Sequence, residues 1–144
     1  MNSLSVQLFC SDLDGTLLGN PEATRRFKEA WESLPRGRRP VLCYNSGRLV
    51  QDLIDILATQ CLPWPDFMIG GVGTQLYDAR RKRALREFSQ TFHQGWDLQK
   101  IEAILAQFPG VIRQPPQFLH PYKSSWFLQQ ANSETIQAIK QELA

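Results

Sequence analysis

The chain has 144 residues, of which 42% are hydrophobic and 21% are charged, and its formal net charge is +2. These values are ordinary for a globular protein in water, and the length suffices for one domain or slightly more. So small a net charge favours no nucleic-acid or membrane partner, and no apolar run approaches the about 20 residues of a membrane span.

The first half of the chain alternates segments with strand and helix patterns. Short apolar runs bounded by turn residues indicate buried strands, and Asn20-Pro21-Glu22 has the cap, the proline and the acid of a helix start. The predicted elements are, in order, a strand at 6–10, a helix from 21 to 34, a strand at 41–44, a helix at 49–57 and a strand at 67–69. Strands that alternate with helices predict a parallel sheet with helices on its faces.

The second half of the chain is less regular. Beyond the glycine-rich segment 70–74, the predicted elements are a strand at 75–77, a basic turn at 78–83, a strand at 84–88, a helix at 98–108 capped by Asp97, a strand at 124–128 and a helix at 133–143. The composition changes near residues 80–90. We therefore predict an α/β core over residues 1–82 and a small α+β piece over residues 83–144.

Two carboxylates follow the first predicted strand at once, in the segment Asp12-Leu13-Asp14-Gly15-Thr16. Open parallel sheets bind ligands beyond the carboxyl ends of their strands, and strand alternation places Asp12 and Asp14 on one side. Such a pair suits Mg²⁺, and one carboxylate can attack a phosphoryl group while the other transfers the proton. Gly15 permits a tight turn, and Thr16 offers phosphate a hydroxyl and an amide. The alternative, a solvated acidic turn, suits a lone Asp-x-Asp better than this longer pattern.

Residues 9–18 resemble the first signature of haloacid dehalogenase-type phosphatases. In that superfamily the first aspartate is the nucleophile, and the second is a general acid/base whose backbone carbonyl also binds magnesium. The resemblance implies these roles for Asp12 and Asp14, and a phosphate-positioning role for Thr16. It also implies an α/β fold with a Rossmann-like core, in which a parallel sheet is flanked by helices.

Asn45-Ser46-Gly47-Arg48 closes the second predicted strand and opens a helix. A helix N-terminus offers free amides and a positive dipole end to an anion, so Ser46 and Gly47 are candidate phosphate-binding residues. The segment resembles the second signature of the same superfamily, and its Gly-Arg is typical of the sugar-phosphatase branch. Asn45 or Ser46 could instead serve only as the helix cap. For Arg48, substrate contact and a plain position on the first helical turn are both open.

Residues 68–77 resemble a strand and loop of that branch, where the loop lies near the leaving group. The resemblance makes Gly73 and Thr74 candidate substrate-binding residues. A glycine-rich hairpin without a ligand is the alternative.

Three later features resemble the sucrose-phosphate phosphatase branch: residues 72–77, Trp96 before a helix, and residues 121–127. In that branch a small cap domain interrupts the core after the third strand, and a cap lysine helps to recognise the sugar phosphate. Lys123 is the matching position, with a surface position on a strand edge as the alternative. For His120 a surface position on a strand edge is preferred. The basic run 80–83 is interpreted as a solvated turn rather than a nucleic-acid site.

Two elements of the family have no match in the sequence. They are a lysine that offsets charge on the aspartyl-phosphate and a Gly-Asp-rich acidic motif that completes the magnesium site, and both normally follow the cap. The resemblance therefore implies an incomplete core and only part of a cap. We expect the chain alone to be weakly active or inactive, because loss of part of a catalytic unit removes most of the rate.

The resulting hypothesis is a Mg²⁺-dependent phosphomonoester hydrolase acting through an aspartyl-phosphate. Its foremost substrate is sucrose 6-phosphate, which it would hydrolyse to sucrose and phosphate in sucrose biosynthesis. Other sugar phosphates, such as those of trehalose or mannosyl-glycerate type, fit the same chemistry. The alternative is a non-catalytic, phosphatase-like module that binds a sugar phosphate or docks to a sucrose-phosphate synthase. The retained Asp12 and Asp14 argue against that alternative, since binding alone needs no nucleophile, whereas the missing second half argues for it.

A cytoplasmic location is predicted from the cysteines and from the start of the chain. Cys10, Cys43 and Cys61 are odd in number and match no metal-ligand spacing, which indicates a reducing compartment. Residues 1–3 lack the basic and apolar pattern of a secretory signal.

Overall fold

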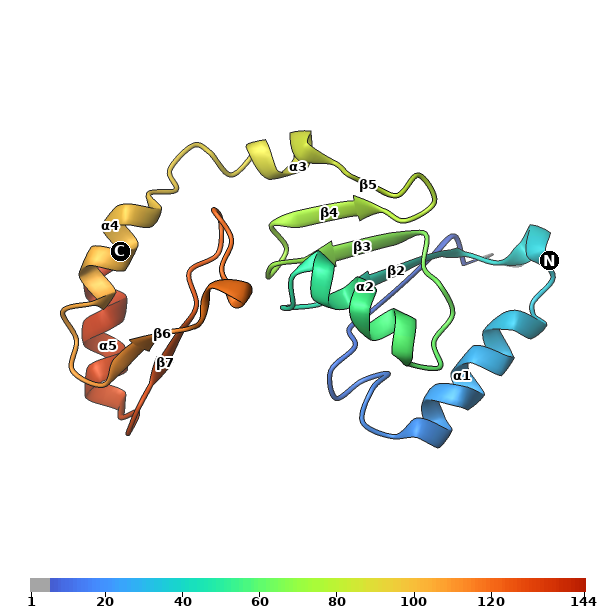
Figure 1. Cartoon of the computed structure of the whole chain (residues 1–144), viewed down its shortest axis with the longest axis horizontal. Helices are drawn as coiled ribbons and strands as arrows, with labels where there is room; N and C mark the ends of the chain where they lie inside the picture. The colour runs from blue at the N-terminus through green and yellow to red at the C-terminus, as the bar shows by residue number, and fades with distance from the viewer. Residues whose placement is uncertain (1–5) are drawn as a thin grey trace. The chain divides into compact units, whose positions relative to one another are not determined.

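The computed structural model describes residues 6–144, which form two compact units (Figure 1). The first unit extends to Gln90, and the second comprises Thr91–Ala144. Residues 1–3, on which the absence of a secretory signal was predicted, lie outside the described part of the chain. No helix in residues 6–144 combines the length and the apolar character that crossing a membrane requires.

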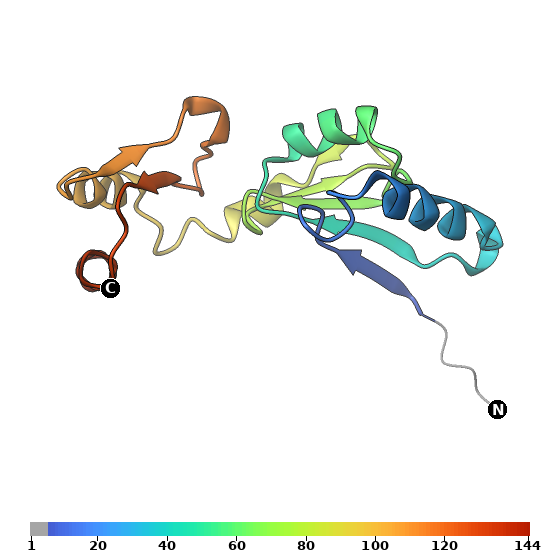
Figure 2. The same ribbon diagram turned by 90° about the horizontal axis from the view of Figure 1, so that it is seen from below.

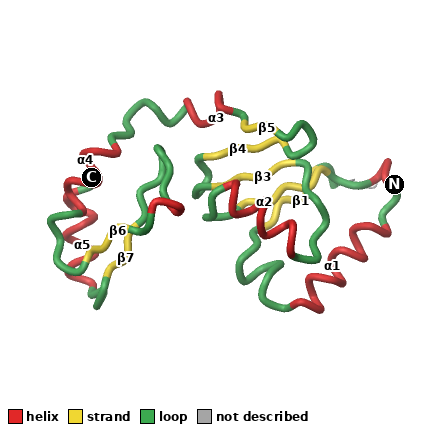
Figure 3. Tube along the Cα trace, in the orientation of Figure 1, coloured by secondary structure: helices red, strands yellow, loops and turns green. Residues whose placement is uncertain are grey.

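The first unit is built on a five-stranded sheet in the order β1-β2-β3-β4-β5. Its strands are β1 (Leu8–Ser11), β2 (Val41–Asn45), β3 (Phe67–Gly70), β4 (Gln75–Asp78) and β5 (Arg83–Ala84). β1, β2 and β3 pair in parallel, as predicted, whereas β4 and β5 extend the sheet in antiparallel fashion. Parallel pairing brings the carboxyl ends of β1, β2 and β3 to one edge, where the loops that follow them gather (Figure 3).

The strand predicted at 84–88 is wrong for most of its length. β5 covers only two residues, and the chain then turns into the short helix α3 (Arg86–Gln90). Arginine, glutamate and glutamine are good helix formers, and Leu85 N–H makes the last bond to β4, at Leu76 O. The first compact unit therefore continues past residue 82, because β5 pairs with β4 and α3 contacts it.

Two helices cover one face of this sheet (Figure 2): α1 (Pro21–Ser33) and α2 (Val50–Thr59). α1 begins as predicted, since the side chain of Asn20 accepts a hydrogen bond from Ala23 N–H at 3.1 Å. It ends before Leu34, and the 3-10 turn Arg36–Arg38 leads to β2. Helices on a mixed sheet whose first three strands are parallel confirm the predicted α/β class.

The core lies between these helices and the sheet. Its buried residues are Leu13, Trp31, Leu42, Tyr44, Leu53, Leu57, Leu62, Met68 and Ala79. Tyr44 is fully buried and donates its hydroxyl to Pro63 O at 2.9 Å, which satisfies the polar atom, while burial raises the pKa of the phenol. Phe9, Phe27 and Trp31 pack with ring centroids 5.6–6.1 Å apart. Core residues of β2 and β3, Tyr44 and Met68, thus fix the positions from which the next loops start.

The second unit is a small α+β piece, as predicted. Its elements are α4 (Leu98–Leu105), β6 (Val111–Arg113), the 3-10 turn Pro116–Phe118, β7 (Trp126–Leu128) and α5 (Ser133–Glu142). Asp97 caps α4 as predicted, by accepting from Lys100 N–H, and Asn132 caps α5 by accepting from Thr135 N–H. β6 was not predicted, because its three residues are too few to show a strand pattern; it pairs antiparallel with β7.

Candidate active site

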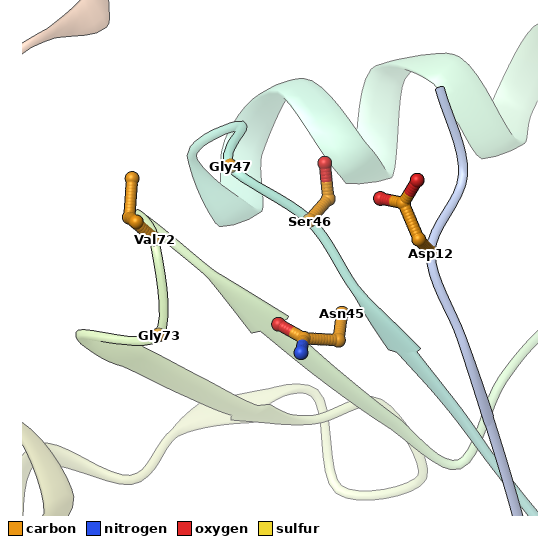
Figure 4. Close-up of a pocket in the computed structure, with 6 residues that line it drawn as sticks. All are labelled: Asp12, Asn45, Ser46, Gly47, Val72 and Gly73. Carbon is orange, nitrogen blue, oxygen red and sulfur yellow. The ribbon is translucent and has the colours of Figure 1, made fainter. Parts of the chain in front are cut away.

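A hollow of about 340 Å³ opens at the carboxyl edge of the parallel strands (Figure 4). Asp12 follows β1 directly, and Asn45 and Ser46 stand at the end of β2, beside it in the sheet. The lining residues are Asp12, Asn45, Ser46, Gly47, Val72 and Gly73. In Figure 4 the Asp12 carboxylate points toward Ser46. Four predicted site residues, namely Asp12, Ser46, Gly47 and Gly73, therefore meet in one cavity, whereas Asn45 and Val72 were not predicted.

The turn after β1 presents the Asp12 carboxylate to solvent. Leu13 is fully buried, and its carbonyl accepts from the backbone N–H groups of Thr16, Leu17 and Leu18. Gly15 has φ +73°, a left-handed conformation that favours glycine. Thr16 Oγ1 donates to Asp12 Oδ2 at 3.1 Å. In this structure the Thr16 hydroxyl thus orients the carboxylate that faces the hollow.

Asp14 is held by Arg48 instead of standing beside Asp12 in the hollow. Arg48 Nε donates to Asp14 Oδ2 at 2.7 Å, and Nη2 donates to Oδ1 at 2.9 Å. These hydrogen bonds hold the pKa of Asp14 below its usual range and raise that of Arg48. Arg48 therefore neutralises the Asp14 carboxylate, which the sequence predicted to bind Mg²⁺ together with Asp12.

Residues 46–49 form a loop between β2 and α2, so the segment 45–48 does not itself open the helix, which starts one residue after the predicted position 49. α2 begins at Val50, and Leu49 makes no side-chain cap. Ser46 Oγ accepts from Arg48 N–H at 3.2 Å, and Ser46 N–H donates to Ile69 O at 2.9 Å. Ser46 is thus not the helix cap, and its hydroxyl proton is available to an anion in the hollow.

The loop between β3 and β4 forms the other wall of the hollow. Gly71, Val72 and Gly73 have consecutive positive φ values of 61°, 58° and 87°. Gly73 N–H and Thr74 N–H both donate to Gly70 O at 3.1 Å, and Thr74 Oγ1 donates to Gly71 O at 2.7 Å. The Thr74 hydroxyl therefore stabilises the loop rather than lining the hollow. Sequence reasoning missed Val72 because a valine between glycines carries no signal of a left-handed conformation.

Gln75 joins the two loops that line the hollow. Val50 N–H, the first amide of α2, donates to Gln75 Oε1 at 3.0 Å, and Gly71 N–H donates to Arg48 O at 2.6 Å. A Cβ atom on Gly70 would lie 2.8 Å from both Arg48 O and Val50 N. The two loops are therefore in direct contact, and Gln75 supplies the helix cap that Leu49 lacks.

Replacement of Gln75 by leucine is expected to leave the Val50 amide without a partner. Loss of one such bond lowers the free energy of unfolding by roughly 1–3 kcal/mol, which urea denaturation can measure. Gln75→Glu keeps the accepting oxygen and should lose less. Gln51→Leu is the matched control, because Gln51 bonds the exposed Asp55 on the surface of α2, and it should have little effect. Equal losses in the three variants would contradict this role of Gln75.

The donor set at this edge fits a hard cation only in part. The Asp12 carboxylate is exposed, and the one hydrogen bond described for it comes from a neutral hydroxyl. Within residues 6–144, no group of three His, Cys, Asp or Glu side chains is arranged to hold a metal ion. Mg²⁺ commonly takes one or two carboxylates and fills its remaining positions with water and substrate phosphate. Asp12 therefore suits Mg²⁺, whereas both carboxylate oxygens of Asp14 accept from Arg48.

Lys123 lies in the second unit, in a tight turn with His120. Lys123 N–H donates to His120 O at 2.8 Å, and His120 N–H donates back to Lys123 O at 3.2 Å. Burial, and secondarily the charge of Lys123, lower the pKa of His120. Contact between Lys123 and a sugar phosphate stays a prediction.

The chain is similar in sequence and in structure to known phosphatases. The family described as sucrose-6F-phosphate phosphohydrolase matches residues 5–144. A mannosylfructose-phosphate phosphatase of Agrobacterium fabrum is 41% identical over 138 residues, which are 96% of this chain and 56% of that protein. The X-ray structure of the sucrose-phosphatase from Synechocystis sp. PCC6803, in complex with sucrose and phosphate, superposes with a TM-score of 0.87 at 25% identity, over 96% of this chain and 56% of that chain.

A more distant structure shares the fold. The haloacid dehalogenase-like hydrolase yhjK from Bacillus subtilis superposes with a TM-score of 0.58 at 16% identity, over 95% of this chain and 56% of that chain. The chain thus spans little more than half the length of each of these three proteins.

Proposed function

Because this chain belongs to the sucrose-6F-phosphate phosphohydrolase family, we propose that it carries the nucleophile-bearing part of a haloacid dehalogenase-type phosphatase that hydrolyses a sugar phosphate. The observation that supports this most directly is the hollow in which the Asp12 carboxylate points toward Ser46. A carboxylate beside hydroxyl and amide donors suits attack on a phosphoryl group. The similarity to a mannosylfructose-phosphate phosphatase and to a sucrose-phosphatase supports a sugar as the leaving group.

The proposed reaction has two steps. An Asp12 carboxylate oxygen forms a bond to phosphorus, the bond between phosphorus and the sugar oxygen breaks, and protonated Asp14 gives its proton to that oxygen. Water then attacks the aspartyl-phosphate while Asp14 takes a proton, and release of phosphate restores the Asp12 carboxylate. Asp14 must leave Arg48 to carry a proton, because both its oxygens accept from the guanidinium in this structure.

The other residues of the hollow bind and orient the phosphate. Thr16 holds Asp12 by the 3.1 Å hydrogen bond, and Ser46 and Gly47 offer a hydroxyl and an open backbone position. Asp12, with the backbone carbonyl of Asp14, would hold Mg²⁺. When bound, such an ion supplies charge stabilisation for the phosphoryl oxygens.

Phosphate release from a panel of sugar phosphates tests the proposal. A chimera would join residues 1–144 to the part of the Agrobacterium protein that lies outside the match. Sucrose 6-phosphate, mannosylfructose phosphate and trehalose 6-phosphate would be compared, with glycerol phosphate as the non-sugar control. We expect release from at least one sugar phosphate, with sucrose 6-phosphate foremost. A folded chimera that binds sugar phosphates without release would favour the non-catalytic alternative, and one that does neither would contradict the proposal.

A further inference from the structure

Val72 has a backbone conformation that valine rarely adopts. Its φ is 58°, and residues 6–144 contain two other non-glycine residues with positive φ, Lys82 and Gln130, both at 51°. Val72 alone among these three is β-branched, which makes its conformation the most strained. It is also 69% exposed, so burial in this unit does not offset the strain.

The surrounding loop imposes this conformation. Gly70 O accepts from two amides beyond Val72, and Thr74 Oγ1 donates to Gly71 O. Gly71 N–H in turn donates to Arg48 O, in the loop that carries Ser46. Val72 is therefore held in place between two anchored segments. Strain that the surrounding structure maintains is concentrated at functional sites.

The Val72 side chain supplies the apolar part of the hollow. It lines the hollow together with Asp12 and Ser46, and in Figure 4 Val72 and Asp12 lie on opposite sides of the Ser46 side chain. Phosphate requires donors and charge, which Val72 lacks. The apolar C–H surface of an organic group binds favourably to methyl groups, because the contact removes both from water. The hollow thus has a polar side suited to phosphate and an apolar side suited to what phosphate is attached to.

We propose that Val72 is a specificity-determining residue that contacts the organic group of the phosphomonoester and so distinguishes a sugar phosphate from inorganic phosphate. This inference rests on the proposed function of the hollow. It accounts for an exposed β-branched residue at a position that asparagine or glycine would occupy with less strain.

The test substitutes Val72 by asparagine in the full chain. Titrations in Mg²⁺ buffer would compare inorganic orthophosphate with sucrose 6-phosphate by NMR. Asparagine tolerates positive φ, so we expect Tm to rise by several degrees. Loss of the apolar contact should weaken sucrose 6-phosphate binding by roughly tenfold and leave orthophosphate binding unchanged. A purely structural residue would not combine higher stability with weaker binding of one ligand only.

Two further variants sharpen the test. Lys82→Asn relieves similar backbone strain in the β4–β5 turn, at the opposite end of β4 from Val72. It should raise Tm without changing the affinity for either ligand. Val72→Ile keeps both strain and apolar surface and should keep the preference for sucrose 6-phosphate. If Val72→Asn binds orthophosphate and keeps the parent preference for sucrose 6-phosphate, the role of Val72 is overturned while the proposed function stands. A chain that binds neither ligand would overturn the proposed function and this inference together.

Discussion

Replacement of Asp12 by asparagine is expected to lower phosphate release from sucrose 6-phosphate by roughly four orders of magnitude. The asparagine amide has nearly the same shape, and its oxygen can still accept from Thr16, but it cannot form an acyl phosphate. The loss should appear in kcat, because the substituted atom takes part in bond formation. Initial rates of phosphate release by the chimera and its Asp12→Asn form give the comparison.

Two controls separate this chemical loss from damage to the fold. Asp97→Asn makes the same substitution at the cap of α4, where asparagine caps as well as aspartate, and its activity should be unchanged. Acid quenching with radiolabelled substrate should trap a phosphorylated protein in the parent chimera and none in Asp12→Asn. Release that survives the Asp12 substitution would refute the covalent mechanism.

Local features of the chain were predictable from the sequence because their causes are local. Asn20 followed by Pro21 starts α1 as expected. The apolar runs before Asp12 and Asn45 became neighbouring parallel strands, since alternating strands and helices leave little other choice of topology. The convergence of Asp12, Ser46 and the glycine-rich loop then follows from the rule that ligands bind beyond the carboxyl ends of parallel strands.

Features set by contacts between distant segments could not be predicted. The start of α2 was predicted to within one residue, but its cap was not, because its first amide bonds to Gln75, 25 positions along the chain. The bidentate bond between Arg48 and Asp14 likewise joins residues 34 positions apart. No sequence pattern marks such pairs, so substrate contact and a plain position on the helix both stayed open for Arg48. The structure adds a third interpretation, in which Arg48 holds the carboxylate of Asp14.

Replacement of Asp14 by asparagine is expected to lower hydrolysis of sucrose 6-phosphate by roughly 10²–10⁴-fold. A sugar alkoxide is a poor leaving group and needs the proton that Asp14 supplies. A nitrophenolate leaves without a proton. With p-nitrophenyl phosphate, the substitution should therefore slow the cleavage of the phosphorus–oxygen bond much less. Burst kinetics of nitrophenol release isolates that step, and equal losses for both substrates would contradict the acid role of Asp14.

Removal of the Arg48 guanidinium tests how the resting ion pair affects that proton. Because hydrogen bonds from Arg48 lower the pKa of Asp14, Arg48→Gln should raise that pKa and move the alkaline limb of kcat/KM to higher pH. Any stability from the pair is present above the unfolded-state pKa of an aspartate and is lost as pH falls through the lower folded-state pKa. The Arg48 and Asp14 side chains are 43% and 50% exposed, so solvent screens that contribution. The pair should therefore matter more to the pH profile than to the fold. If Arg48→Gln leaves the alkaline limb of kcat/KM at the same pH and raises KM, Arg48 would instead be assigned to substrate binding.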